Sequence, residues 1–190
     1  MNLSSSTTTI LMVVFGVLVV VLLAVYVVRN KKKSAALRKR FGTEYERAVV
    51  THGSERKAEA KLADREKRVE KLNIRELGAT ERERFIASWL TVQSRFVDHP
   101  KGAVTEADEL VTSLLQARGY PLSNFEQRAD DLSVDYPRLL ENYRSAHSIA
   151  VRNGNVDATT EELRTAMIHY RGLFDELIQV TKPATEKSAA

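Results

Sequence analysis

The hydrophobic pattern begins with an unbroken apolar run near the N-terminus. Residues 10–28 form a stretch of 19 residues without a charged side chain, an amide or a proline. A helix of that length extends ~28 Å, close to the ~30 Å hydrocarbon thickness of a bilayer. Valine is a mediocre helix former in water, but in lipid the backbone can hydrogen-bond only to itself. The run therefore predicts one transmembrane helix, preceded by an extracytoplasmic tail over residues 1–9.

A cleaved signal peptide is the alternative, and it would leave a secreted domain. Three features disfavour it. The first nine residues contain no lysine or arginine, no small-residue cleavage site follows the apolar run, and the run is long for a signal peptide. The anchor is the favoured interpretation.

A basic strip over residues 29–40 follows the apolar run, with no acidic residue in it: Arg29, Lys31, Lys32, Lys33, Arg38, Lys39 and Arg40. Cytoplasmic flanks of membrane helices carry such an excess of positive charge. We therefore expect the N-terminus outside and the C-terminal part in the cytoplasm. At the membrane surface the strip acts either as a topology signal alone or also as an attractor of anionic lipid.

The charge of the remaining chain argues against a nucleic-acid partner. The whole chain has 29 basic and 25 acidic residues, and removing the seven of the strip leaves 22 basic against 25 acidic. The excess of positive charge thus belongs to the membrane-proximal strip. A nucleic-acid-binding domain needs a basic face on its folded part.

A charged helical segment over residues 41–72 is predicted to separate the anchor from the rest. Its apolar positions Ala58, Leu62, Val69 and Leu72 have heptad spacing, but Arg65 interrupts the stripe. The segment is either a solvated spacer helix or one strand of a weak coiled coil through which two copies associate. Because two heptads are short for a coiled coil, the spacer is favoured.

Residues 73–180 show the pattern of a compact, all-α, four- to five-helix bundle. Apolar side chains recur at steps of three and four, as in Phe85, Trp89, Val92 and Phe96, and helix-capping residues and prolines separate the runs. The expected helices cover about residues 80–97, 103–118, 123–132, 137–153 and 159–180. Pro100 and Gly102 are expected to break the chain, and residues 181–190 to be a disordered tail.

The sequence contains no catalytic, cofactor or metal motif. There is no cysteine, and no histidine follows a glutamate at the three-residue spacing of di-iron bundles. The most suggestive polar group is Tyr143, Arg144 and His147 on one helix, with Tyr170 on another. It is either a ligand pocket or the polar edge of a core, and the absence of a carboxylate at catalytic spacing favours the core edge.

Two aromatic–proline corners flank the helix expected at 123–132. Tyr120 precedes one proline and Tyr136 the other, with Phe125 and Arg128 between them. Such corners usually cap a core, but exposed tyrosine and arginine are also favoured anchors for a protein partner. Core capping is the favoured interpretation.

The segment from Arg95 to Ala150 resembles a group of bacterial proteins. The shared pattern is of the type RF.DDP..AV..AD.LV…RGYP…FEQRA.DLSVD.P…YR.AH, with His99 here in place of an acidic residue. Members are described as hypothetical, secreted or membrane proteins, and several have an N-terminal hydrophobic segment. The resemblance implies a helical domain anchored in a bacterial inner membrane, and it implies no activity or site residue.

Two functions remain open. The first is a non-enzymatic interaction or scaffold module, anchored in the membrane and bound to a protein partner. The second is an enzyme or small-ligand sensor with a pocket between the bundle helices. The first is favoured because it requires nothing beyond the features described above.

Overall fold

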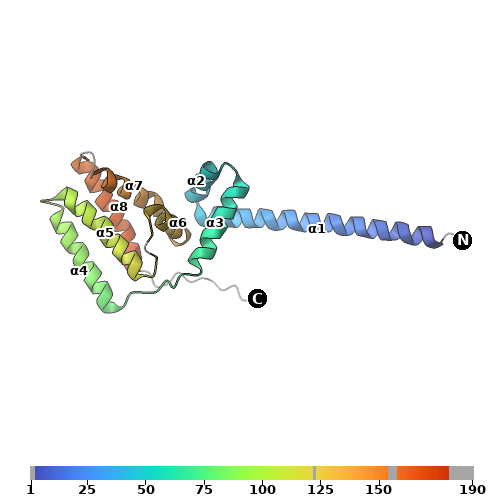
Figure 1. Ribbon diagram of the computed structural model, residues 1–190, viewed down its shortest axis with the longest axis horizontal. Coiled ribbons are helices and arrows are strands. Elements are labelled where there is room, and N and C mark those ends of the chain that lie inside the picture. The colour runs from blue at the N-terminus through green and yellow to red at the C-terminus, as the bar shows by residue number, and fades with distance from the viewer. Residues whose placement is uncertain (1–2, 122, 154–157, 180–190) are drawn as a thin grey trace. The chain divides into compact units, whose positions relative to one another are not determined.

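A computed structural model describes residues 3–121, 123–153 and 158–179, and within these ranges all regular structure is helical (Figure 1). This confirms the predicted all-α class. The described helices are α1 (Leu3–Phe41), α2 (Thr43–His52), α3 (Glu55–Val69), α4 (Ala79–Arg95), α5 (Pro100–Ala117), α6 (Phe125–Asp135), α7 (Leu140–Asn153) and α8 (Thr160–Gln179). The tail expected at 181–190 lies outside the described residues.

The chain divides into two compact units, Met1–Phe41 and Gly42–Ala190. The first consists of α1, a single helix that continues without interruption from the apolar run through the basic strip. Within the described part of the chain, one helix is long and apolar enough to cross a membrane, over Leu11–Phe41. Helix α1 ends at Phe41, and the following Gly42 has a positive φ of 52°.

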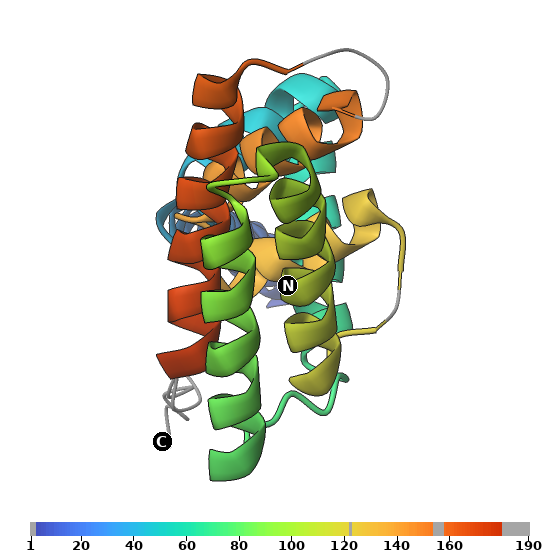
Figure 2. The same cartoon turned by 90° about the vertical axis from the view of Figure 1, so that its left-hand side faces the viewer.

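In the second unit, α5 is the central helix. It packs against α4, α7 and α8, and α7 also packs along α8. Figure 2 shows α4 (green), α5 (olive) and α8 (red) running side by side. In α8 the apolar side chains that recur at steps of three and four are all buried, from Leu163 through Tyr170 to Leu177. Local periodicity thus identified the face that this helix turns to the core.

Three helix starts differ from the prediction: α7 begins at Leu140 and not at residue 137, and the starts of α5 and α6 differ as well. Pro100 does not break the chain but begins α5 as its first residue, a position where the missing N–H of proline costs nothing. Helix α6 begins at Phe125 and not at residue 123, because Asn124 caps it: the Asn124 side chain accepts a 2.9 Å hydrogen bond from Gln127 N. Helix α8 begins close to the expected residue, where Thr159 Oγ1 accepts a 3.2 Å hydrogen bond from Glu162 N.

The turn after α5 requires glycine. Gly119 has a φ of 98°, and a Cβ there would lie 2.3 Å from the backbone oxygen of Asn73. The incoming segment is held at this point by a hydrogen bond from Arg75 N to Arg118 O (2.9 Å). Both the left-handed backbone and the close approach of a second chain segment exclude a larger residue.

The segment expected to be a spacer belongs to the same compact unit as the bundle. Helices α2 and α3 pack on each other, and α3 packs on α6. Ala58, Leu62 and Val69 of the heptad stripe are all buried in this unit. The boundary between units thus falls at Gly42, whereas we expected one between residues 72 and 73, and the stripe is already covered within one chain.

Charged side chains fill the gap in that stripe. Arg65 lies 3.4 Å from Glu44 Oε2 of α2 and 2.6 Å from Asp130 Oδ1 of α6. The same Glu44 oxygen lies 3.2 Å from Arg144 of α7, and Glu44 is only 4% exposed. On the neighbouring turn, Arg68 Nε donates to buried Asp131 over 2.7 Å. The α2–α3 pair is therefore joined to the bundle by ion pairs as well as apolar contacts.

Candidate functional site

A partly buried polar cluster brings together several residues singled out from the sequence, around one carboxylate that the sequence analysis did not single out. Asp108 of α5 accepts a 2.8 Å hydrogen bond from the Tyr170 hydroxyl of α8. His147 Nδ1 of α7 lies 3.3 Å from the same Asp108 oxygen. Three neighbouring helices thus each contribute one member. The carboxylate whose absence favoured a plain core edge is supplied by the tertiary fold.

Aromatic rings connect this cluster to α6. The Phe125 ring stacks on His147 with centroids 3.7 Å apart and an interplanar angle of 6°. Tyr143 lies next to both Phe125 and Tyr170, at centroid distances of 5.1 Å and 6.3 Å. Arg128 Nε donates to the Tyr143 hydroxyl over 3.0 Å. The candidate residues of α6, α7 and α8 therefore form one continuous network.

The surroundings in the cluster shift the pKa values of Asp108, Tyr143 and Tyr170. Burial by itself raises the pKa of Asp108, but hydrogen bonds from His147 and Tyr170 outweigh it, and the pKa is lowered. Burial raises the pKa of Tyr143 to about 12, and burial together with the Asp108 charge raises the pKa of Tyr170. At neutral pH the carboxylate is charged and both phenols keep their protons. Each phenol can therefore donate its proton, as Tyr170 does to Asp108, and its oxygen can still accept, as Tyr143 does from Arg128.

An open groove lies beside the cluster, with a volume of about 690 Å³. Its residues come from α2, α6 and α7 and from the residue preceding α6: Arg47, Asn124, Phe125, Glu126, Arg144, His147, Ser148, Val151 and Arg152. Phe125 and His147 belong to both the groove and the cluster. The groove lining thus combines the apolar side chains of Phe125 and Val151 with three arginines.

The arginines of the groove are held by carboxylates of the same chain. Arg144 lies between buried Glu44 and exposed Glu126, at 3.2 Å and 3.3 Å. Arg47 lies 3.9 Å from Glu141, and Arg152 pairs with Glu162. The positive charge of the lining is therefore largely compensated. Chemically, the groove suits a partly apolar partner surface better than a free anion.

The two corner tyrosines are core residues. Tyr120 and Tyr136 are both buried, and the Tyr120 hydroxyl donates to Asp135 Oδ2 over 2.6 Å. Burial is also the main reason that the pKa of each tyrosine is raised. Their favoured interpretation as core caps agrees with this placement. Both rings therefore lie inside the unit and offer little surface for a partner to contact.

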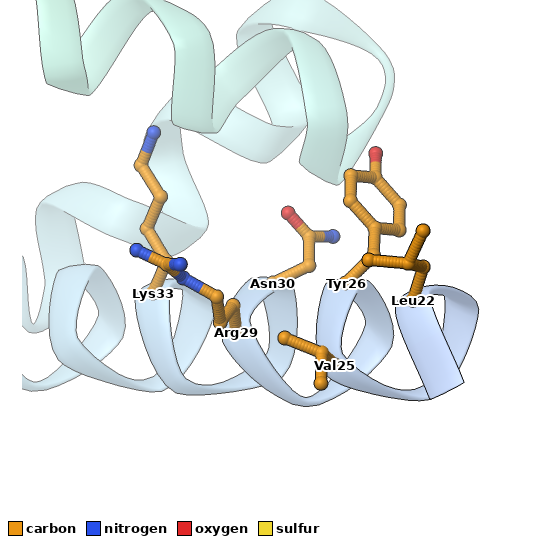
Figure 3. A pocket seen from close by; sticks show the side chains of 6 residues that line it. All are labelled: Leu22, Val25, Tyr26, Arg29, Asn30 and Lys33. Atoms are coloured by element: carbon orange, nitrogen blue, oxygen red, sulfur yellow. The ribbon is translucent and has the colours of Figure 1, made fainter. Parts of the chain in front are cut away.

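The basic strip lies on the C-terminal part of α1, and all seven of its side chains are exposed. Figure 3 shows side chains along the transition from the apolar run to this strip. Leu22, Val25 and Tyr26 are followed by Arg29, Asn30 and Lys33. Tyr26, Asn30 and Lys33 extend to the same side of the helix (Figure 3).

Asp108 and the Glu44 ion pairs are the functional candidates that sequence reasoning missed. A signal for Asp108 was present. It lies four residues after Val104 and three before Val111, so a carboxylate interrupts the buried face of α5. Arg65 was noticed as an interruption of the α3 stripe, but its partners lie 21 and 65 residues away. Spacing within one helix does not reveal such partners.

Among the described residues, no group of three or more His, Cys, Asp or Glu side chains is arranged to hold a metal ion. Comparison with models of protein families, with curated proteins and with solved structures gives no match.

Proposed function

We propose that this protein is a single-pass membrane protein whose second unit is a non-enzymatic interaction module on the cytoplasmic side. In this proposal α1 crosses the bilayer through residues 10–28, and Gly42–Ala190 binds a protein partner near the inner membrane surface. The observation that carries the proposal is the exposed apolar surface of α1. Every side chain of Leu11–Val28 is exposed, which in water would leave a large apolar area unburied.

The direction of insertion follows from charge. Seven exposed basic residues follow the apolar run, and none precedes it. Moving this strip through the membrane is disfavoured, so the strip and all that follows it stay in the cytoplasm.

We expect a reporter fused after Ala190 to be active only if it works in the cytoplasm. In a bacterial host, green fluorescent protein at this position should fluoresce, and alkaline phosphatase should be inactive. The fusion should stay in the membrane after alkaline extraction and keep its full mass. Replacing all seven basic residues with glutamine should scramble the orientation, because no other feature of the short flanks sets it.

An active alkaline phosphatase fusion contradicts the assigned orientation. Loss of about 28 residues from the mature chain, with release from the membrane, establishes the secreted alternative.

The groove supports an interaction role for the second unit. Phe125 and Val151 provide apolar contact, and Arg47 and Arg152 remain about half exposed at the rim despite their carboxylate partners. Aromatic and arginine side chains around an apolar centre are typical of protein interfaces. The groove is open, which favours a protein segment over an enclosed small ligand.

Val151 offers a test with a matched control. Val151 and Ile168 are both 54% exposed on helices, but only Val151 lines the groove. Val151→Glu should reduce partner capture from detergent-solubilised membranes by about tenfold, which corresponds to roughly 1.4 kcal/mol of binding free energy. Ile168→Glu should leave capture unchanged. The free energy of unfolding of both variants should stay within about 1 kcal/mol of the wild type.

Quantitative mass spectrometry of the captured proteins provides the measurement. Equal capture by the wild type and Val151→Glu removes the groove as the partner site. A small molecule that co-purifies in place of a protein favours the alternative, a ligand sensor or enzyme built around the Asp108 cluster.

A further inference from the structure

We infer that one face of α1 at the end of the apolar run is a binding site for the phosphate headgroup of an anionic phospholipid. The site consists of Tyr26, Arg29, Asn30 and Lys33. The inference rests on the proposed membrane function, and it adds a specific lipid class and specific residues to it.

The four residues lie on one side of the helix. With roughly 100° of rotation per residue, Arg29 and Lys33 lie about 40° apart around the axis, and Tyr26 lies about 20° beyond Lys33. Leu22 lies on the same face one turn before Tyr26. Figure 3 shows the resulting order along the helix, with apolar side chains first, then the phenol ring, then the amide and the two cations. A phospholipid presents the same order from its acyl chain to its phosphate.

Depth in the membrane separates the basic residues into two groups. At ~1.5 Å per residue, positions 29–33 fall within ~8 Å of the end of the apolar run, which is about the thickness of the headgroup layer. Arg38, Lys39 and Arg40 fall ~15–18 Å beyond it, outside that layer. Of the seven basic residues, only Arg29, Lys31, Lys32 and Lys33 therefore reach phosphate depth.

The polar groups of the site suit a phosphate. Arg29, Asn30 and Lys33 provide N–H donors and two positive charges, and none of the residues that line this face with them is acidic. A phosphodiester accepts hydrogen bonds and carries one negative charge. Because the site supplies two positive charges, it should prefer lipids whose headgroup carries no positive charge of its own. The phenol of Tyr26 suits the interface between the apolar and polar layers. By contrast, Lys31 and Lys32 lie about 160° and about 100° around the helix from Lys33, and both lie more than about 100° from Tyr26.

This contrast gives a charge-matched test. The double variants Arg29→Gln/Lys33→Gln and Lys31→Gln/Lys32→Gln each remove two positive charges at nearly the same depth. The full chain is reconstituted in mixed phosphatidylcholine–phosphatidylglycerol vesicles. The relative association of spin-labelled phosphatidylglycerol and phosphatidylcholine with the protein is then measured by electron spin resonance.

The wild type should prefer phosphatidylglycerol. Arg29→Gln/Lys33→Gln should lower that preference at least about fivefold, the effect of roughly one surface charge. Lys31→Gln/Lys32→Gln should stay within about twofold of the wild type. Inorganic phosphate should not reduce the preference relative to sodium chloride of equal ionic strength, because free phosphate lacks the acyl chains that lie along Leu22 and Val25.

Two results would overturn the site. Equal losses in the two double variants would mean that the strip attracts anionic lipid only through its summed charge. Competition by inorganic phosphate would mean that the residues bind phosphate of any source. Flotation of the same vesicles keeps the underlying proposal separate. Protein that does not float with the lipid refutes membrane insertion itself, whereas protein that floats without lipid preference refutes only the headgroup site.

Discussion

Replacing Trp89 with alanine is expected to lower the free energy of unfolding of the second unit by about 3–5 kcal/mol. The Trp89 ring is buried and stacks on Phe174 of α8, with centroids 4.8 Å apart and an interplanar angle of 18°. Its removal opens a cavity where α4 meets α8 and ends an aromatic pair. Because domains of this size are stable by about 5–15 kcal/mol in total, the variant should be partly unfolded or degraded.

Leu90 provides the control for Trp89. It is the next residue of α4 and is 60% exposed. Leu90→Ala should therefore stay within about 1 kcal/mol of the wild type. Both variants are compared as full chains in mild detergent, by urea denaturation followed through far-UV circular dichroism. If Trp89→Ala melts like Leu90→Ala, α4 is not packed on α8 in solution.

The helices could be predicted from the sequence because their signals are local. The apolar stripe through Leu163, Tyr170 and Leu177 can be recognised from the sequence of one helix alone, and all three residues are buried. Caps depend on finer competition. Ser123 and Asn124 both have side chains able to cap α6, and the structure uses Asn124. Residue types alone do not choose between two adjacent capping residues.

The candidate site could be predicted only in part. Tyr143 and His147 were grouped correctly because they lie one turn apart, and the sequence suggested Tyr170 as a neighbour. The centre of the cluster, Asp108, comes from another helix, and its pairing with Tyr170 spans 62 residues. A carboxylate among apolar positions of α5 was a warning sign, since buried charges require partners.

The role of residues 41–72 was the least visible from sequence. A thin apolar stripe interrupted by an arginine such as Arg65 is normally a solvated face. From the pattern of one helix alone, the arginine is expected to be exposed to water. In the structure Arg65 instead has two carboxylate partners, Glu44 and Asp130. Glu44 also accepts a hydrogen bond from Arg144, which lies 100 residues after it in the chain. Buried ion pairs of this kind join residues far apart in the sequence, and the periodicity of a single helix does not reveal them.

Glu44→Gln is therefore expected to be strongly destabilising, by about 3 kcal/mol. The Glu44 carboxylate lies between Arg65 and Arg144, whose side chains are only 12% and 10% exposed. Removing its charge takes away the carboxylate that these two mostly buried guanidinium groups share. Arg65 keeps Asp130, but Arg144 keeps only the exposed Glu126. Leaving a buried charge without its partner costs far more than the intact pair contributes.

Glu46 of the same helix is the matched control. Its side chain is exposed, so Glu46→Gln makes the identical chemical change where water screens the charge. That variant should stay within about 0.5 kcal/mol of the wild type. Urea denaturation of the two full-length variants measures the difference.

Hydrogen exchange then shows where the lost stability resides. If the α2–α3 pair can leave the bundle separately, Glu44→Gln should increase exchange in α3 while α8 keeps its protection. If the pair and the bundle form one cooperative unit, protection should fall in both helices together. Should Glu44→Gln change neither stability nor exchange, the α2–α3 pair is not docked in solution. Residues 41–72 would then be the solvated spacer that their charge pattern predicts, because only an undocked Glu44 can lose its charge without stranding Arg144.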